Sequence, residues 1–366
     1  MDTFHETLKK QKESIFAFTL ALAAAILIKI PTLFGIQLDQ DESFYIRNMS
    51  FSVLPLLAGY FIWKRQLGTR PIIELALVFL AAGVFANIYP FDQNSDTEVL
   101  VALHLPIALW LVVGTAFLGG RWDQVHRRMD FVRFSGELFI YYVLLALSGG
   151  VLTGFMALIF GTIGIDIEPF FESWILPCGA TGAVIVASWL VENRKNMTQN
   201  IAPVLARLFT PLFTIILITF LGTLLWTGSG VDIERDVLIA FDMLLLIVLG
   251  LLLYGISARD RGSTPGAFDI VQVVLVISAL LADAVALWAI TERIADFGFT
   301  ANRVVALGMN IILLINLLWS TVLYIRFLNR RGSFQALERW QMNYLLVYAV
   351  WAAFVVVIFP PLFGFG

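Results

Sequence analysis

The chain has few charged residues, one cysteine and three histidines among its 366 residues. Charged residues make up 14% of the chain, whereas a soluble domain usually contains about 25%. Hydrophobic residues make up 59%, so an ordinary soluble domain is excluded. The single cysteine, Cys178, has no second thiol in the chain with which to form a disulfide bond.

The motifs of common soluble enzymes are also missing. The chain has no phosphate-binding loop, no dinucleotide-binding fingerprint and no serine nucleophile elbow. Its His, Cys, Asp and Glu residues do not follow the spacing of a metal site. Basic residues cluster beside apolar blocks instead of forming a surface for nucleic acid. We therefore predict no cofactor, no resident metal and no nucleic-acid partner.

Apolar residues come in repeated blocks of about 20, the length of a helix that crosses a hydrocarbon core of about 30 Å. We predict an all-α polytopic transmembrane bundle, a single integral membrane domain over residues 1–366 with about eleven spans. The loops are short and contain no inserted soluble domain. The expected spans lie near 14–35, 48–63, 71–90, 98–119, 138–160, 169–191, 204–227, 236–256, 269–290, 302–325 and 341–362.

Lysine and arginine residues predict how the chain is threaded. Eighteen of the 24 fall in the N-terminal segment and in alternate loops, on one side of the predicted membrane. Because basic residues are retained on the cytoplasmic side, the N-terminus is expected in the cytoplasm and the C-terminus outside. The four on the outer side are Arg47, Arg235, Arg293 and Arg303.

The stretch from Asp269 to Arg303 carries the most informative pattern, a stripe of polar and small residues along an apolar helix. Its members follow one another at spacings of three and four, which places them on one helix face. They are Asp269, Gln272, Val276, Ala279, Asp283 and Ala286. A carboxylate such as Asp283 inside a span is costly, so we expect it to face protein or water and not lipid.

Five polar residues are predicted at a similar depth, roughly 9–12 Å below the outer boundary at 1.5 Å per residue. They are Lys29, His104, Asp242, Asp283 and Asn310. One interpretation is a buried ion pair with hydrogen-bonded neighbours that fixes helix register. The other is a substrate or proton site open to the outer face. Lys29 alone could also snorkel outward, and a single histidine such as His104 is more often a packed polar residue than a ligand.

Arg293 and Arg303 are predicted at the outer mouth of this site. Arg303 lies in the first turn of a helix, where the helix dipole disfavours a cation. An anion is therefore expected near it. Asp296 or Glu292 is one candidate, and a lipid phosphate or an anionic substrate is the other.

The run FGFTANR, which follows the acid-bearing span, resembles the bacterial membrane family called domain of unknown function 4153. Further similar stretches are RFSGELFIYYVLLALSGGVLTG (133–154), GTIGIDIE (161–168), LARLFTPLF (205–213) and LGMNIILLINLL (307–318). The similarity covers a core at 131–330, while residues 1–130 match less clearly and 331–366 add the last span. The resemblance implies a multi-pass protein of the bacterial cytoplasmic (inner) membrane. It does not imply any particular activity. The family often has proline where this chain has Ala301, so we expect Thr300 to cap the following helix in either case.

Three functions fit these residues. In a transporter or permease-like protein, Asp283 and Asp242 would bind a cation or carry protons, with Lys29 as counter-charge. In a glycosyltransferase that uses polyprenyl-phosphate sugars, the outer-loop motif Asp41-Glu42-x-x-Tyr45 would supply an acidic residue as base or metal partner. A non-catalytic envelope or lipid-binding accessory protein is the third. We favour the first, with membrane lipids and a small solute or an anionic lipid as partners, and an enzyme is less favoured.

The threading can be tested with single cysteines in a Cys178→Ala chain. A membrane-impermeant maleimide applied to intact cells should label Phe299→Cys in a predicted outer link. It should label Gln66→Cys, in a predicted cytoplasmic loop, only after permeabilisation. The reverse pattern would show that the orientation is wrong.

Overall fold

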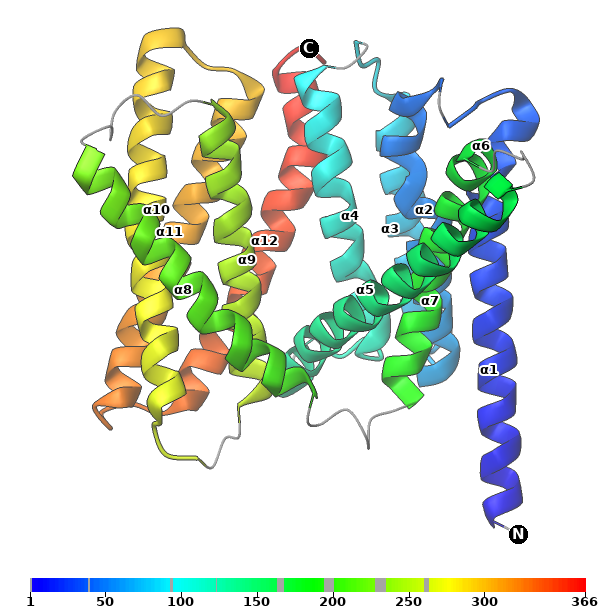
Figure 1. Ribbon diagram of the computed structural model, residues 1–366, viewed down its shortest axis with the longest axis horizontal. Coiled ribbons are helices and arrows are strands. Elements are labelled where there is room, and N and C mark those ends of the chain that lie inside the picture. Colours follow the sequence, from blue (N-terminus) through cyan, green and yellow to red (C-terminus); the bar gives the residue numbers. More distant parts are fainter. Residues whose placement is uncertain are drawn as a thin grey trace. The chain divides into compact units, whose positions relative to one another are not determined.

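The computed structural model describes residues 2–38, 40–92, 95–122, 124–162, 168–193, 201–227, 235–259 and 263–366. Within these ranges the chain forms helices and no strand (Figure 1), which confirms the predicted all-α class. The elements are α1 (Asp2–Leu27), η1 (Ile30–Phe34), α2 (Glu42–Arg65), α3 (Thr69–Ile88), α4 (Asp96–Phe117), α5 (Val125–Thr162), α6 (Glu168–Phe170), the π-helix η2 (Phe171–Ile175), α7 (Leu176–Asn193), α8 (Ile201–Thr227), α9 (Arg235–Ala258), α10 (Ala267–Phe297), α11 (Ala301–Leu328) and α12 (Phe334–Leu362).

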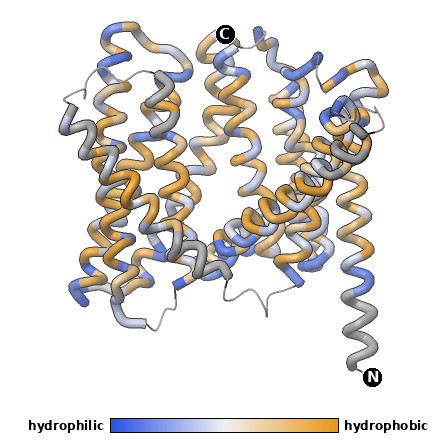
Figure 2. Tube along the Cα trace, viewed as in Figure 1, coloured by the Kyte–Doolittle hydropathy of each residue, from blue (hydrophilic) through white to orange (hydrophobic). Residues whose placement is uncertain are grey.

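Among the described residues, 8 helical stretches are long and apolar enough to cross a membrane. They are Gln11–Phe34, Thr69–Ile88, Asp96–Phe117, Val125–Gly154, Glu168–Asn193, Ala267–Phe297, Ala301–Leu328 and Phe334–Leu362. Hydrophobic residues run along most of the helices, and hydrophilic residues lie at their ends (Figure 2). The helices are thus those of an integral membrane protein. Eleven spans and a cytoplasmic N-terminus stay predictions.

Contacts within the chain define two compact units. Unit 1 comprises residues 1–122, 137–197 and 365–366, and unit 2 comprises residues 123–136 and 198–364. In unit 1, α2 packs against α4 and α1 packs against α7. In unit 2, α10 packs against α8, α9 and α11, and α11 packs against α12.

Ion pairs fasten one end of unit 1. The Lys64 ammonium pairs with Glu13 and lies 3.2 Å from Glu192, and Arg65 Nη2 lies 3.0 Å from the same Glu192 oxygen. The Tyr60 hydroxyl donates a 2.6 Å hydrogen bond to Glu13. Because these residues come from α1, α2 and α7, the pairs join three helices.

The stripe predicted on α10 forms the buried face of that helix. All six of its residues are buried, including Asp283, whose exposed fraction is 0%. The prediction that this carboxylate faces protein is therefore confirmed. At the start of α10, Asp269 accepts a 2.8 Å hydrogen bond from the Gly266 N–H and pairs with Arg259 at 2.8 Å, which caps the helix and neutralises its first acid.

The start of α11 also agrees with its sequence. Thr300 is the N-cap, and its hydroxyl accepts a 3.4 Å hydrogen bond from the Arg303 N–H. A threonine side chain in this position satisfies one of the backbone donors that a helix start leaves unpaired. The helix begins at Ala301, so the proline frequent in the resembled family is not required here.

Within unit 2, α11 and α12 approach closely at Gly308. A Cβ atom at this position would lie 2.1 Å from Cη2 of Trp351. The Trp351 ring packs in turn against Phe354 and Phe359, with ring centroids 5.9 and 6.1 Å apart. The absence of a side chain at Gly308 is thus what lets the tryptophan fit against α11.

We expect Gly308→Ala to lower the free energy of unfolding by about 1–3 kcal/mol, because the indole must move out of a packed position. Thermal unfolding of the purified protein in detergent would measure the change. Gly250→Ala is the matched control in the same unit, since nothing lies within 4 Å of a Cβ atom there. Equal midpoints for the two variants would contradict the close approach.

Candidate functional site

Asp283 lies near the middle of α10 in unit 2. Its neighbours on the buried face are Ala279, Ala282 and Ala286, each with an exposed fraction of 0%. Neither oxygen of its carboxylate has a hydrogen-bond partner among the described residues. A buried carboxylate without a donor or a cation is unfavourable by several kcal/mol, so this position calls for an explanation.

A second carboxylate and an amide accompany it. Asp242 of α9 interacts electrostatically with Asp283. Asn310 of α11 donates a 3.0 Å hydrogen bond from Nδ2 to Asp242 Oδ1 and a 2.9 Å bond to the Ala306 carbonyl. The carboxylate cluster, defined as Asp242, Asp283 and Asn310, therefore draws one residue from each of three helices. These are three of the five residues that the sequence placed in one layer.

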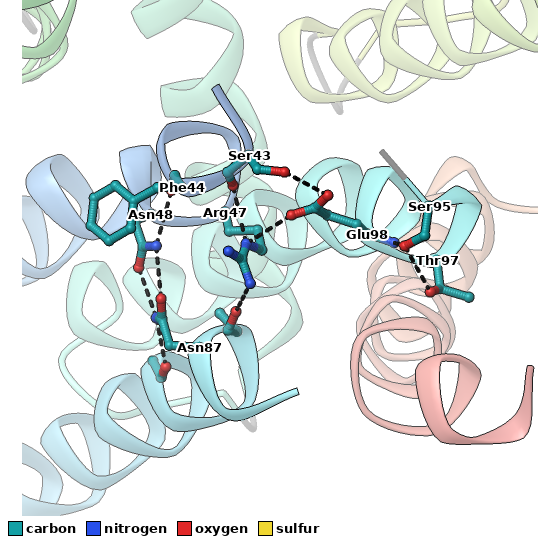
Figure 3. Close-up of polar contacts among 10 residues, drawn as sticks. Ser43, Phe44, Arg47, Asn48, Asn87, Ser95, Thr97 and Glu98 are labelled. Carbon is teal, nitrogen blue, oxygen red and sulfur yellow. Dashed lines mark hydrogen bonds and ion pairs between the residues drawn. The ribbon is translucent and has the colours of Figure 1, made fainter. Parts of the chain in front are cut away.

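Glu98 in unit 1 shows how a buried carboxylate is normally accommodated in this protein (Figure 3). Its exposed fraction is 2%. One oxygen accepts a 2.7 Å hydrogen bond from the Ser43 hydroxyl, and the other lies 3.0 Å from Arg47 Nε. Both oxygens of Glu98 are thus paired, whereas neither oxygen of Asp283 has a partner in the part of the chain that the structure describes.

The contacts around Glu98 also join helices α2, α3 and α4. Arg47 donates a 3.3 Å hydrogen bond to the Ala86 carbonyl, and the amides of Asn48 and Asn87 bond to each other at 2.9 and 2.8 Å (Figure 3). The Ser95 hydroxyl caps α4 by accepting from the Glu98 N–H at 3.2 Å. We assign this group a structural role because its charges are compensated.

The sequence places Arg47 on the predicted outer side and Glu98 at the start of the predicted span 98–119, and it does not identify this group. Two signals could have revealed it. Ser95-x-x-Glu98 is the pattern of a helix capping box, and Arg47 is a basic residue on the predicted outer side, where the positive-inside rule makes basic residues rare. Neither signal, however, identifies the two residues as partners.

Three other buried carboxylates resemble Glu98. Glu13 and Glu192 pair with Lys64, and Asp269 pairs with Arg259. Their charges are compensated by basic residues in contact with them. Asp283 differs from all of these in having no such partner among the described residues.

Lys29 and His104 belong to unit 1 and bond to backbone carbonyls. Lys29 Nζ donates a 2.7 Å hydrogen bond to the Ser173 carbonyl and lies 4.7 Å from the ring centroid of Trp174. It has no ion-pair partner among the described residues of unit 1. His104 Nδ1 lies 2.9 Å from the Leu100 carbonyl oxygen of its own helix, as in a packed polar histidine.

Arg303 is compensated by an unexpected group. Its Nη1 donates to the Phe297 and Gly298 carbonyls at 3.0 and 2.9 Å, and its guanidinium lies 5.5 Å from the Phe297 ring centroid. The negative end of the α10 dipole therefore offsets this cation. Neither Asp296 nor Glu292, the acids expected to do so, is among its described partners. Arg293 is half-buried in α10, and the side chain of Arg235 is outside the described residues.

The motif Asp41-Glu42-x-x-Tyr45 stabilises its own loop. Asp41 Oδ2 accepts a 2.8 Å hydrogen bond from the Gln37 N–H, and the Tyr45 hydroxyl donates to the Ile36 carbonyl at 3.2 Å. Glu42 is exposed in the first turn of α2. These contacts account for two residues of the motif without reference to catalysis.

No protein-family model matches the chain, and neither a curated protein nor a solved structure matches it. The function is therefore inferred from the side chains. Among the described residues, no three His, Cys, Asp or Glu side chains gather as a metal centre would require. The carboxylate cluster instead offers oxygen acceptors from three helices, a composition suited to taking up a proton or a hard cation.

Two isosteric substitutions should distinguish the contributions of the Glu98 and Asp283 carboxylates to stability. Glu98→Gln leaves the half-buried Arg47 guanidinium uncompensated, so we expect it to lower the free energy of unfolding by about 3–5 kcal/mol. Asp283→Asn removes a charge that has no partner among the described residues, so it should leave stability unchanged or raise it.

Thermal and denaturant unfolding in detergent, in choline chloride without added metal cations, would measure both variants. The interpretation would be wrong if Asp283→Asn destabilised the protein as much as Glu98→Gln. That result would mean that the Asp283 charge is paired in the folded protein.

Proposed function

We propose that this integral membrane protein is a permease-like transporter, in which the carboxylate cluster takes up positive charge as a step of the transport cycle. The observation that carries the proposal is Asp283, a fully buried carboxylate without a partner among the described residues. A carboxylate kept in an apolar core without stabilising the fold is typical of ion and proton pathways.

The two carboxylates of the cluster are not equivalent. Asp242 accepts a hydrogen bond from the Asn310 amide, and this bond stabilises its charged form. Asp283 receives no such bond from the described residues. The repulsion between two adjacent negative charges is therefore relieved best when a proton or a cation binds at Asp283. We assign Asp283 the exchange of positive charge, and Asp242 the role of the fixed negative charge beside it.

The position of Asp283 supports this role. It is carried by α10, which packs against α8, α9 and α11 in unit 2. A change in charge at this point alters the packing preference of a helix with three neighbours. Such coupling between ion occupancy and helix packing is what a transporter needs in order to alternate between states.

The type of membrane, the orientation and the number of spans belong to the same proposal. We place the protein in the bacterial cytoplasmic membrane, with the N-terminus in the cytoplasm and eleven spans. The asymmetric distribution of lysine and arginine supports the orientation. The similarity of 131–330 to domain of unknown function 4153 supports the membrane, and the carboxylate cluster lies within that region.

Electrical recordings from proteoliposomes on a solid support test the proposal without a known substrate. A rapid jump in external pH or in sodium concentration should displace charge in the wild type. Asp283→Asn should reduce this transient to less than about one-tenth, because the exchanging group is gone.

Asp296→Asn is the matched control, since Asp296 is an exposed acid on the same helix. It should leave the transient unchanged. A wild type that gives no transient to either jump, or an Asp283→Asn variant that retains it, would rule out charge uptake at this cluster.

A further inference from the structure

The carboxylate cluster contains three buried oxygen atoms that accept no hydrogen bond from the described residues. They are both oxygens of Asp283 and Oδ1 of Asn310. The exposed fraction of each residue is 0%. Buried polar atoms are nearly always paired, and three unpaired acceptors from two side chains of one cluster indicate a ligand that accepts lone pairs.

The orientation of the Asn310 amide is well determined. Its Nδ2 group has two protons, and it donates to Asp242 Oδ1 at 3.0 Å and to the Ala306 carbonyl at 2.9 Å. Both partners are acceptors, so exchanging the amide oxygen and nitrogen would lose two hydrogen bonds and place oxygen against oxygen. The atom left unpaired on Asn310 is therefore an acceptor.

A second buried asparagine on α11 shows how both ends of such an amide can be hydrogen-bonded. Asn316 donates from Nδ2 to Gln341 Oε1 at 3.1 Å and to the Tyr348 hydroxyl at 2.7 Å, and its Oδ1 accepts from Trp340 Nε1 at 2.8 Å. The amide of Asn316 is satisfied at both ends. The unpaired oxygen of Asn310 is thus a property of its site and not of asparagine in this helix.

A proton does not satisfy the cluster. Protonation turns one oxygen of Asp283 into a donor, which can bond to one other acceptor. At least one of the three oxygens then still lacks a partner. A bound cation accepts lone pairs from several oxygens at once, and oxygen ligands are those that hard cations prefer.

The number of oxygens favours a monovalent ion. Calcium takes about 6–8 oxygen ligands, and magnesium requires near-ideal octahedral geometry and retains water. The cluster supplies two carboxylates and one amide oxygen in an aliphatic environment, and the cost of stripping water from an ion rises steeply with its charge. A small monovalent cation therefore fits better than a divalent one.

We propose that the carboxylate cluster is a sodium site, with Asp283, Asp242 and Asn310 Oδ1 as ligands. The proposal deepens the proposed function, on which it rests, by naming the ion that carries the charge. In this site Asn310 also holds Asp242 in place through its Nδ2 group, and its Oδ1 completes the ligand set.

Sodium-dependent stability of the full-length protein in detergent tests the site. Thermal unfolding would be followed while NaCl replaces choline chloride at constant ionic strength and pH. For the wild type, the midpoint should rise by about 2 °C for each tenfold increase in sodium above the dissociation constant. Asp283→Asn should abolish this rise, Asn310→Ser should shift it to at least tenfold higher sodium, and the control Asp296→Asn should retain it.

The sodium site would be overturned if KCl raised the midpoint as NaCl does, if NaCl had no effect beyond choline chloride, or if the rise persisted in Asp283→Asn. Binding of radioactive sodium to the wild type, at the same pH, gives a second readout that does not depend on unfolding. If sodium has no effect but pH jumps still displace charge through Asp283, the ion is a proton and only the sodium site fails. If neither ion has an effect, the proposed function fails as well.

Discussion

Charge compensation inside a low-dielectric environment is the constraint on which this structure depends. A charged side chain that leaves water in a membrane protein must find an opposite charge, a set of donors or a bound ion. Most of the buried acids described here meet this requirement through contact with lysine or arginine. Glu98 accepts a hydrogen bond from Ser43 and pairs with Arg47. Glu192 pairs with Lys64 and Arg65, and Asp269 pairs with Arg259. In each case the pair also fixes where two or more helices meet.

The same constraint explains why the carboxylate cluster is the best candidate for function. A pair such as Arg47 and Glu98 is stable in one state of the protein, because separating its members leaves a buried charge alone. Asp283 has no built-in partner among the described residues, so its compensation must come from something that binds. A site that depends on an exchangeable ion can exist in two states, whereas a site closed by an arginine cannot do so without a large cost. Unit 2 also contains a buried amide, that of Asn316, whose nitrogen and oxygen are both hydrogen-bonded. The unpaired oxygens of Asp283 and Asn310 among the described residues can be compared with it.

Helix ends obey the constraint in another way. Arg303 lies in the first turn of α11, on the predicted outer side, and an acid or an anionic ligand was the expected partner. The carbonyls of Phe297 and Gly298 take that role instead, since the end of α10 carries partial negative charge. Lys29 likewise uses the Ser173 carbonyl and the face of Trp174. Backbone dipoles and aromatic faces thus replace carboxylates, and neither is visible as a charge in a sequence.

Local patterns in the sequence were sufficient to predict the helices and their membrane character. The 3.6-residue period identified the buried face of α10 in advance, because a helix places residues three and four apart on one side whatever surrounds it. The Thr300 cap could be predicted for the same reason, since its partner lies three residues away. The sequence also marked Asp283, Asp242 and Asn310 as polar residues of similar depth.

The tertiary structure alone decided which polar residues have partners. Glu98 meets Arg47 because of how α2 and α4 pack, and Asp283 meets no cation among the described residues because of how α9, α10 and α11 pack. Asn310 orients its amide toward Asp242, a residue 68 positions away, so no local period encodes it. Helical periodicity fixes the face on which a side chain lies. The neighbour that it meets is fixed by the contacts of another helix, and the charge balance of the site follows from that neighbour.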